Sequence, residues 1–271
     1  MINTPLGKLY AVGVGTGDSE LMTLKAVRLI QAADVIAIPE KNKGQADSFA
    51  WEIVTGAIPE TDIHGERCFL HFPMTRDASR TIPAWQSAAI SIVEHLTLGK
   101  NVVFVTEGDP SVFSTWAYIQ EELSILEPQL EPEIIPGITS ITAVPAATRI
   151  PLADGKERFC VVPTTYGIDC LDRLVKEFDT IMFIKAGRMI PVLSAKFKQL
   201  GLEGNATYVS HATTDRQEIY TNLDDVPEEH RYFSMVQLSI RGRSGVLRGK
   251  QDDEPLEPSR FLSGNKLAAL A

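Results

Sequence analysis

The chain has 271 residues, with 35 acidic and 26 basic side chains and a formal net charge of -9. This balance argues against a nucleic-acid partner, because phosphate backbones are bound by basic faces. No apolar run approaches the roughly 20 residues that span a bilayer, and the N-terminus lacks the pattern of a signal peptide, so we expect a cytoplasmic protein without membrane association. The 3 cysteines form no C-x-x-C pair, and neither a disulfide framework nor a metal site is predicted.

The first half of the chain alternates short apolar runs with helical patterns. Residues 6–14 predict a buried strand, and a glycine segment with Asp18 follows. Apolar residues at helical spacing then predict one buried helix face, with Asp18 or Ser19 as its N-cap; these are Leu21, Leu24, Val27 and Ile30. Residues 34–39 predict a second strand, so we expect a β-α-β unit with parallel strands.

From residue 40 to residue 80 the sequence is irregular and charged, although 46–57 suit a helix and 67–72 a strand. Pro83 is expected to begin a helix that ends near Gly99. Residues 102–105 are apolar and mostly β-branched, as in a strand buried on both faces. A glycine and a proline break the chain after this strand, and a helix is expected from near Ser111.

The remaining chain predicts a strand at 133–136 and a helix of small residues to about residue 148. A short polar segment at 151–156 is the expected linker. After it, strands are predicted at 158–163, 180–184, 206–210 and 232–240, with helices at 169–178 and 191–200. We therefore expect an α/β protein of two domains, 1–152 and 153–242, with a mainly parallel first sheet, a mixed second sheet and a flexible tail at 243–271.

Two glycine loops carry a carboxylate at the carboxyl edge of the first sheet, where open α/β sheets bind ligands. Gly13, Gly15 and Gly17 depart from the dinucleotide fingerprint, because Asp18 occupies the position of its third glycine. A nicotinamide-dependent oxidoreductase is therefore the less favoured alternative. The loop that contains Asp109 has the same acidic character, which suits a cationic ligand such as an adenosyl sulfonium. Asp109 could equally cap the helix expected from Ser111.

Three ordered segments together resemble the tetrapyrrole (corrin/porphyrin) methyltransferases. They are residues 13–26, residues 106–115 and residues 135–140. Within that family they look most like enzymes that methylate carbon 20 of precorrin-2 or cobalt-factor II in cobalamin biosynthesis. Methylation of another tetrapyrrole, such as uroporphyrinogen III, is the alternative within the family.

The resemblance implies two α/β domains that hold S-adenosylmethionine in a cleft between them, in a homodimer. The cofactor-binding residues that it implies are Thr16, Glu107, Gly108, Asp109, Val112, Phe113, Thr139, Ser140, Ile184, Lys185, Ala212, Thr213 and Leu238. The family usually has proline where this chain has Thr16, which affects the rigidity of the first loop.

The implied substrate is a tetrapyrrole with eight carboxylates, with or without bound cobalt. Its carbon 20 must lose a proton after methylation, and the candidate bases are Glu107, Asp18 and Tyr166. Its carboxylates need local cations, for which the candidates are Arg67, Arg76, Arg80, Lys156, Arg158 and Arg188. The histidines show no metal-ligand spacing; they are His64, His71, His95, His211 and His230.

Overall fold

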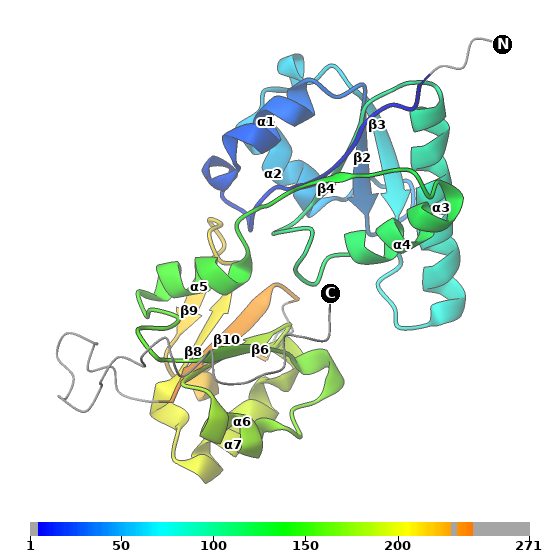
Figure 1. Cartoon of the computed structure of the whole chain (residues 1–271). Coiled ribbons are helices and arrows are strands. Elements are labelled where there is room, and N and C mark those ends of the chain that lie inside the picture. The colour runs from blue at the N-terminus through cyan, green and yellow to red at the C-terminus, as the bar shows by residue number, and fades with distance from the viewer. Residues whose placement is uncertain (1–4, 229–231, 241–271) are drawn as a thin grey trace, which may run out of the picture.

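The computed structural model describes residues 5–228 and 232–240, which form two lobes, each built around a five-stranded sheet (Figure 1). The expected tail, 243–271, lies outside the described residues. No helix in this described part combines the length and apolar character needed to cross a membrane.

The sheet of the first lobe is entirely parallel, with strand order β3-β2-β4-β1-β5. Its strands are β1 (Leu9–Gly13), β2 (Val35–Glu40), β3 (Glu66–His71), β4 (Val102–Thr106) and β5 (Glu133–Ile135). The expected β-α-β unit is present, but β4 lies between β1 and β2, so these two strands do not pair directly. Parallel polarity brings all five carboxyl ends to one edge, which faces the second lobe.

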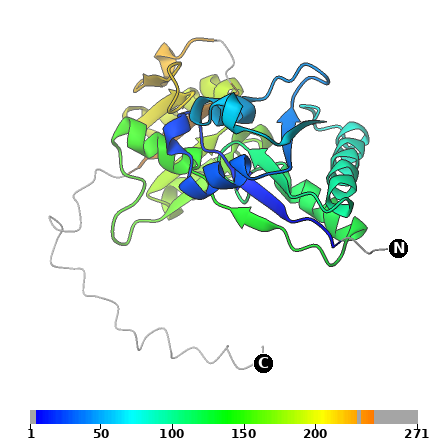
Figure 2. The ribbon, with the colours of Figure 1, turned by 90° about the horizontal axis from the view of Figure 1, so that it is seen from above.

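Helices cover both faces of this sheet, so its central strands are buried on two sides. They are α1 (Leu24–Gln31) and α2 (Phe49–Ala57) on one face, and α3 (Ala78–Thr97) and α4 (Trp116–Leu126) on the other. The view from above places α1, in blue, and α3, in teal, on opposite sides of the strands (Figure 2). All five residues of β4 are buried, which explains why four of them are apolar and four are β-branched.

Helices α1, α3 and α4 begin at residues other than those predicted. α1 begins at Leu24 because the Thr23 side chain accepts a hydrogen bond from the Ala26 N–H, and this register leaves Leu24 89% exposed rather than on the buried face. α3 begins five residues before Pro83 with Asp77 as its cap, so the proline lies inside the helix. α4 begins only at Trp116, which leaves a longer loop after β4.

The second lobe contains the predicted mixed sheet, in the order β6-β7-β10-β8-β9. Its strands are β6 (Phe159–Pro163), β7 (Thr180–Ile184), β8 (Ala206–Ser210), β9 (Glu218–Tyr220) and β10 (Ser234–Ser239). Only β6 and β7 pair in parallel. The three-residue β9 was not predicted, because its sequence is too short to show alternation.

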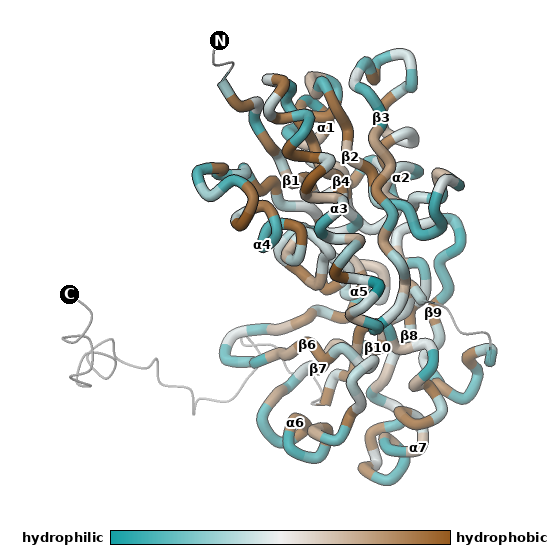
Figure 3. Tube along the Cα trace, turned by 90° about the vertical axis from the view of Figure 1, so that its right-hand side faces the viewer, coloured by the Kyte–Doolittle hydropathy of each residue, from teal (hydrophilic) through white to brown (hydrophobic). Residues whose placement is uncertain are grey.

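Helices also cover the two faces of the second sheet. α6 (Leu171–Glu177) and α7 (Ile190–Leu200) pack on one face, and α5 (Ser140–Thr148) packs on the other through Val144. Gln237 of β10 donates from its side-chain amide to the Ile150 carbonyl, which ties the segment after α5 to the same sheet. By its packing, α5 belongs with the second sheet, although it precedes residue 152. The hydropathy view shows the apolar strands of both lobes enclosed by more polar helices and loops (Figure 3).

Candidate functional site

Three loops meet at the carboxyl ends of β1, β4 and β5, and glycine is what permits their close approach. A Cβ atom on Gly137 would lie 2.1 Å from the Gly108 carbonyl oxygen, and one on Gly13 would lie 2.5 Å from the same oxygen. Gly108 also donates to the Gly15 carbonyl oxygen over 2.7 Å. The three segments that carried the family resemblance are therefore one packed unit at the ligand-binding edge of the sheet.

Asp109 fastens two of these loops together. Its carboxylate accepts hydrogen bonds from the Ser111 N–H at 2.7 Å and from the Gly137 N–H at 3.0 Å, and the residue is buried. The expectation that Asp109 caps the following helix is wrong, because that helix starts at Trp116. Both carboxylate oxygens accept hydrogen bonds from backbone N–H groups of the site, so the buried Asp109 holds the two loops together.

The glycine loop after β1 contacts the second lobe directly. The Thr16 and Thr213 hydroxyls are 3.0 Å apart, and the Asp18 backbone N–H donates to Thr213 Oγ1 over 3.1 Å. A Cβ atom on Gly17 would lie 2.3 Å from the Thr214 side chain. The position where the family usually has proline thus supplies a hydroxyl that bonds across the two lobes. A hollow of about 300 Å³ borders this contact, with Asp18 and Thr213 in its wall.

A second bridge joins the lobes at the other side of the sheet. Arg76, in the loop after β3, donates to the Thr165 carbonyl oxygen and lies over the Tyr166 ring, 5.0 Å from its centroid. Thr165 and Tyr166 belong to the short 3-10 helix Thr164–Tyr166 that follows β6. The loops of β2 and β4 therefore lie between two interlobe contacts, one at β1 and one at β3.

The three candidate bases are not brought together. Asp18 lies at the first bridge, where its side chain caps a 3-10 helix, and Tyr166 lies at the second bridge and is 78% exposed. Glu107 lies between them, on the loop of β4. The residue as a whole is half-buried, but burial of its carboxyl raises the pKa of Glu107, and the N–H groups of Glu107 itself and of Ala50 oppose this shift.

The remaining predicted cofactor residues differ in how deeply they are buried. Ile184 is buried at the carboxyl end of β7, and Phe113 is 54% exposed. The other five lie in loops or near strand ends and are half-buried; they are Val112, Thr139, Ser140, Lys185 and Ala212.

Leu238 differs from all of these. Its side chain is fully buried in the core beneath α6 and α7, and it pairs with Ile181, three residues before the carboxyl end of β7. Leu238 therefore does not line the site. Met235 pairs with Ile184 and occupies the edge position instead.

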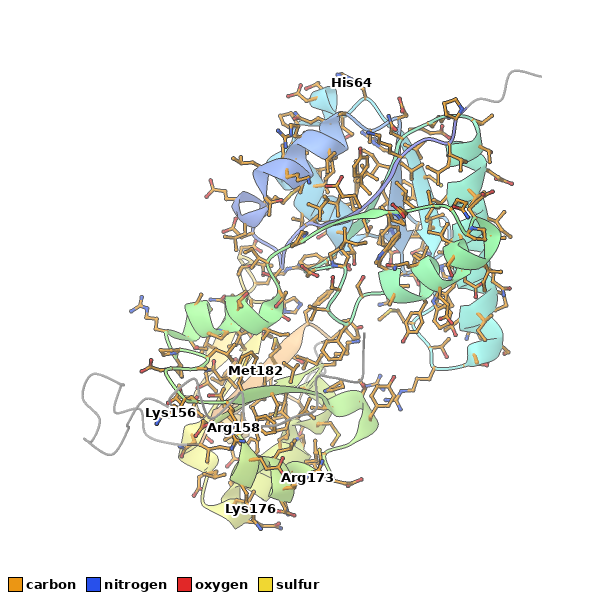
Figure 4. All side chains as sticks on the ribbon, in the orientation of Figure 1. His64, Lys156, Arg158, Arg173, Lys176 and Met182 are labelled. Atoms are coloured by element: carbon orange, nitrogen blue, oxygen red, sulfur yellow. The ribbon has the colours of Figure 1, made fainter. Side chains whose placement is uncertain are left out.

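The predicted carboxylate-binding cations also separate by position. Arg67 lies near the amino end of β3, where it bonds Glu60 and lies over Trp51. Lys156 and Arg158 precede the amino end of β6, while the carboxyl end of that strand faces Arg76 (Figure 4). These three residues are remote from the ligand edge, which argues against a role as substrate ligands. Arg76, Arg80 and Arg188 follow the carboxyl ends of their strands and remain candidates.

No cluster of histidine, cysteine and acidic side chains suited to a metal ion occurs in residues 5–228 and 232–240. His64 lies at the end of the first lobe remote from the second (Figure 4), and His230 is outside the described residues. All three cysteines are free and half-buried. Burial, with Cys170 and Glu177 nearby, raises the pKa of the Cys160 thiol to about 11, so it is a poor nucleophile at neutral pH.

Sequence comparison now adds to this geometry. Residues 8–227 match the family model described as Tetrapyrrole (Corrin/Porphyrin) Methylases. The chain belongs to this tetrapyrrole methylase family.

Two curated relatives match over most of both chains. A probable cobalt-precorrin-2 C(20)-methyltransferase of Methanocaldococcus jannaschii is 34% identical over 87% of this chain and 97% of its own. A cobalt-precorrin-2 C(20)-methyltransferase of Salmonella typhimurium is 30% identical over 85% and 95%. Among solved structures, uroporphyrin-III C-methyltransferase of Thermus thermophilus, complexed with S-adenosylhomocysteine, has a TM-score of 0.59 at 22% identity over 86% of this chain and 97% of its own. That likeness supports the two-lobed tetrapyrrole methylase fold.

Some residues of the site were missed from the sequence. In the sequence, Gly13 and Gly137 are marked only as members of the family segments, yet they set the distance between the loops. Gly13 lies near the end of the strand predicted at 6–14 and Gly137 directly after the strand predicted at 133–136, and these positions are the signal that could have identified them. Thr214 carried no such signal, because its role depends on contact between lobes.

Proposed function

We propose that this protein transfers a methyl group from S-adenosylmethionine to carbon 20 of precorrin-2 or of its cobalt-containing form. The observation that carries the proposal is the packing of the three family segments, through Gly13, Gly108 and Gly137, into one unit at the carboxyl edge of the first sheet. The two curated relatives named for this reaction, at 34% and 30% identity, support the same position of methylation.

The site fits an adenosyl ligand in chemical character. Gly108 has a φ of 65° and open space where a Cβ would lie, so its backbone can approach a ligand closely. The half-buried Thr16, Thr139 and Ser140 supply hydroxyls on neighbouring loops. We propose these residues, with Thr213 and Lys185 of the second lobe, as the cofactor contacts, and Asp109 as the support that positions them.

Methyl transfer from a sulfonium is a displacement at carbon in which positive charge disappears. Its main demand is alignment of the nucleophilic carbon, the methyl group and the sulfur, and positioning can supply up to about 7 to 11 kcal/mol in favourable cases. Loops tied together by Asp109 and by the Thr16–Thr213 contact meet that demand. When bound, S-adenosylmethionine supplies the methyl group, and no covalent intermediate with the protein is needed.

Removal of the carbon 20 proton is the second demand, and we propose Glu107 as its acceptor. The raised pKa of this carboxyl gives it more basic character than an ordinary glutamate. Its loop lies between the two interlobe bridges, whereas Asp18 and Tyr166 lie at the bridges themselves. Glu107→Gln should lower kcat and leave the affinity for S-adenosylhomocysteine within about twofold; an unchanged kcat would transfer the role to another group.

The proposal is tested by incubating the purified protein with S-adenosylmethionine and either precorrin-2 or cobalt-factor II, side by side. A mass gain of one methyl on at least one substrate is expected. Methylation of uroporphyrinogen III alone would favour the sibling reaction, and thermal stabilisation by NAD but not by S-adenosylhomocysteine would favour the oxidoreductase alternative. We further propose a cytoplasmic homodimer; the mass in solution, measured by light scattering, should be twice that of the chain.

A further inference from the structure

A second hollow, of about 410 Å³, opens where the chain leaves β2 and β3. Its walls come from the loop that joins β2 to α2, and from the loop between β3 and α3 with the first turn of α3. Four of its lining side chains are cationic or imidazole groups, namely Lys41, Lys43, Arg80 and His71. We call this hollow the β2–β3 pocket. Arg80 alone among the four was named from the sequence as a carboxylate ligand.

The cationic side chains of the pocket are not paired with carboxylates of the described part of the chain. Within the part of the chain that the structure describes, Lys41, Lys43 and Arg80 form no ion pair. The carboxylate closest to Arg80 in sequence is Asp77, whose pKa is lowered mainly by hydrogen bonds from Ser79, with a smaller contribution from Arg80. Three positive charges therefore surround one hollow in a chain whose net charge is -9.

The acidic residues of the same loop are satisfied by its own backbone. The buried Glu40 accepts hydrogen bonds from the N–H groups of Gly44 and Ala46, at 2.8 and 3.1 Å. Asp47 accepts from the N–H of Asn42 at 2.9 Å. These bonds shape the loop around the pocket. Because both carboxylates already accept backbone hydrogen bonds, Lys41 and Lys43 remain available to an anion from solution.

His71 adds a hydrogen-bond donor to the wall. Its Nδ1 is buried and has no hydrogen-bond partner among the described residues. A proton on this nitrogen would be a buried, unpaired donor, which is costly, so Nε2 is the favoured position for the ring hydrogen. The His71 Nε2–H is therefore the group available to a bound ligand.

The β2–β3 pocket lies on the same edge as the candidate methyl-transfer loops. β2 pairs in parallel with both β3 and β4, so the carboxyl ends of the three strands lie side by side. At about 4.8 Å between neighbouring strands, the pocket begins roughly 5 to 10 Å from the end of β4. The backbone N–H of Ala50, in the first turn of α2, opposes the raised pKa of the Glu107 carboxyl and so links the two regions. A macrocycle placed with its reacting carbon at the β4 loop would extend toward this pocket.

We propose that the β2–β3 pocket binds a side-chain carboxylate of the tetrapyrrole substrate and thereby fixes the orientation of the macrocycle. The proposal rests on the proposed function, because it takes the substrate to be a polycarboxylate tetrapyrrole. Arg80 supplies a planar guanidinium that can hold a carboxylate in bidentate fashion, and Lys41 and Lys43 supply point charges on the opposite loop. This clamp holds the edge of the macrocycle that carries the bound carboxylate at the β2–β3 side of the site.

The test uses binding of uroporphyrin III, an octacarboxylate tetrapyrrole, followed by its fluorescence. Lys41→Gln combined with Arg80→Gln should weaken this binding about tenfold or more, because charge-assisted hydrogen bonds are lost. The affinity for S-adenosylhomocysteine should stay within about twofold. Added salt should weaken uroporphyrin III binding less steeply in the variant than in the wild type. Arg80→Lys alone should retain part of the affinity.

The matched control is Lys176→Gln, an exposed lysine of α6 in the second lobe (Figure 4). It should bind uroporphyrin III as the wild type does. Unchanged binding in the double variant, or no binding by the wild type, would overturn the pocket assignment. Weakened binding in the double variant alongside a wild type that methylates neither precorrin-2 nor cobalt-factor II would leave the assignment standing and contradict only the proposed function.

Discussion

The Asp109 carboxylate accepts a hydrogen bond from the Gly137 N–H at 3.0 Å, although the two residues are 28 positions apart in the chain. This bond joins the loop after β4 to the loop after β5. With the Ser111 N–H on its other oxygen, Asp109 is a buried acceptor for two backbone donors. The geometry of the site therefore depends on a carboxylate that acts from inside the protein.

Asp109→Ala should destabilise the protein by roughly 3 kcal/mol, because it leaves two backbone donors without their charged acceptor. The affinity for S-adenosylhomocysteine should also fall, since the two loops lose their connection. Urea unfolding and calorimetric titration measure the two effects. Asp109→Asn, which keeps one acceptor oxygen, should lose less of both. Unchanged stability in the alanine variant would contradict the structural role of this carboxylate.

Gly137→Ala should disturb the same unit by steric conflict. The added methyl would lie 2.1 Å from the Gly108 carbonyl oxygen, which is backbone and cannot rotate away. We expect a loss of about 2 kcal/mol or more in the free energy of unfolding, together with weaker cofactor binding. Gly204→Ala is the matched control, because no atom lies within 4 Å of its added Cβ; its stability should change by less than about 0.5 kcal/mol.

Thr213→Val should weaken the contact between the lobes while keeping the shape of the side chain. The substitution removes the hydroxyl that bonds Thr16 and the Asp18 N–H, at an expected cost of roughly 1 to 2 kcal/mol in stability. Thr213→Ser retains the hydroxyl and should restore most of that stability. If valine and serine behave alike in thermal unfolding, the hydroxyl does not carry the contact.

Arg76 and Tyr166 should show energetic coupling, because the guanidinium lies over the ring across the two lobes. A double-mutant cycle with Arg76→Gln and Tyr166→Leu should give a coupling energy of about 0.5 to 1 kcal/mol, as for an exposed cation–π contact. Additive effects of the two substitutions on stability would mean that this bridge is not maintained in solution.

Glu107→Gln should change how stability depends on pH. Burial raises the folded-state pKa of this acid, so its protonated form is favoured in the folded protein. Its stabilising contribution is complete below the unfolded-state pKa and is lost as the pH rises through the folded-state pKa. The glutamine variant should therefore gain stability over the wild type at neutral pH, and the gain should shrink on acidification. A gain that grows at low pH would contradict the direction of the shift.

Much of the fold follows from local sequence patterns. The apolar run at 102–105 predicted a strand buried on both faces, and β4 is fully buried; the strand predicted at 180–184 is present as β7, which is fully buried too. Helix starts were less predictable, because the caps Thr23 and Asp77 compete with other polar residues nearby. The three-residue β9 and the placement of β4 between β1 and β2 depend on long-range pairing that periodicity does not encode.

The parts of the candidate site that lie next to strongly predicted strands could be predicted from the sequence. The glycine loops and Asp109 stand out in the sequence because they come where clearly predicted strands end. Leu238 was misplaced because antiparallel β10 presents its amino end, at Met235, to the site. Lys41 and Lys43 belong to an irregular, charged stretch with no motif that marks a site, and only the three-dimensional pocket distinguishes them.

The most direct test of the central claim is to locate the transferred methyl group. The protein should be incubated with S-adenosylmethionine labelled with carbon-13 in its methyl group, and with precorrin-2 and cobalt-factor II in parallel. The product should carry one labelled methyl, assigned by NMR to carbon 20 of the macrocycle. Absence of label from both products, or its assignment to any other carbon, would contradict the account.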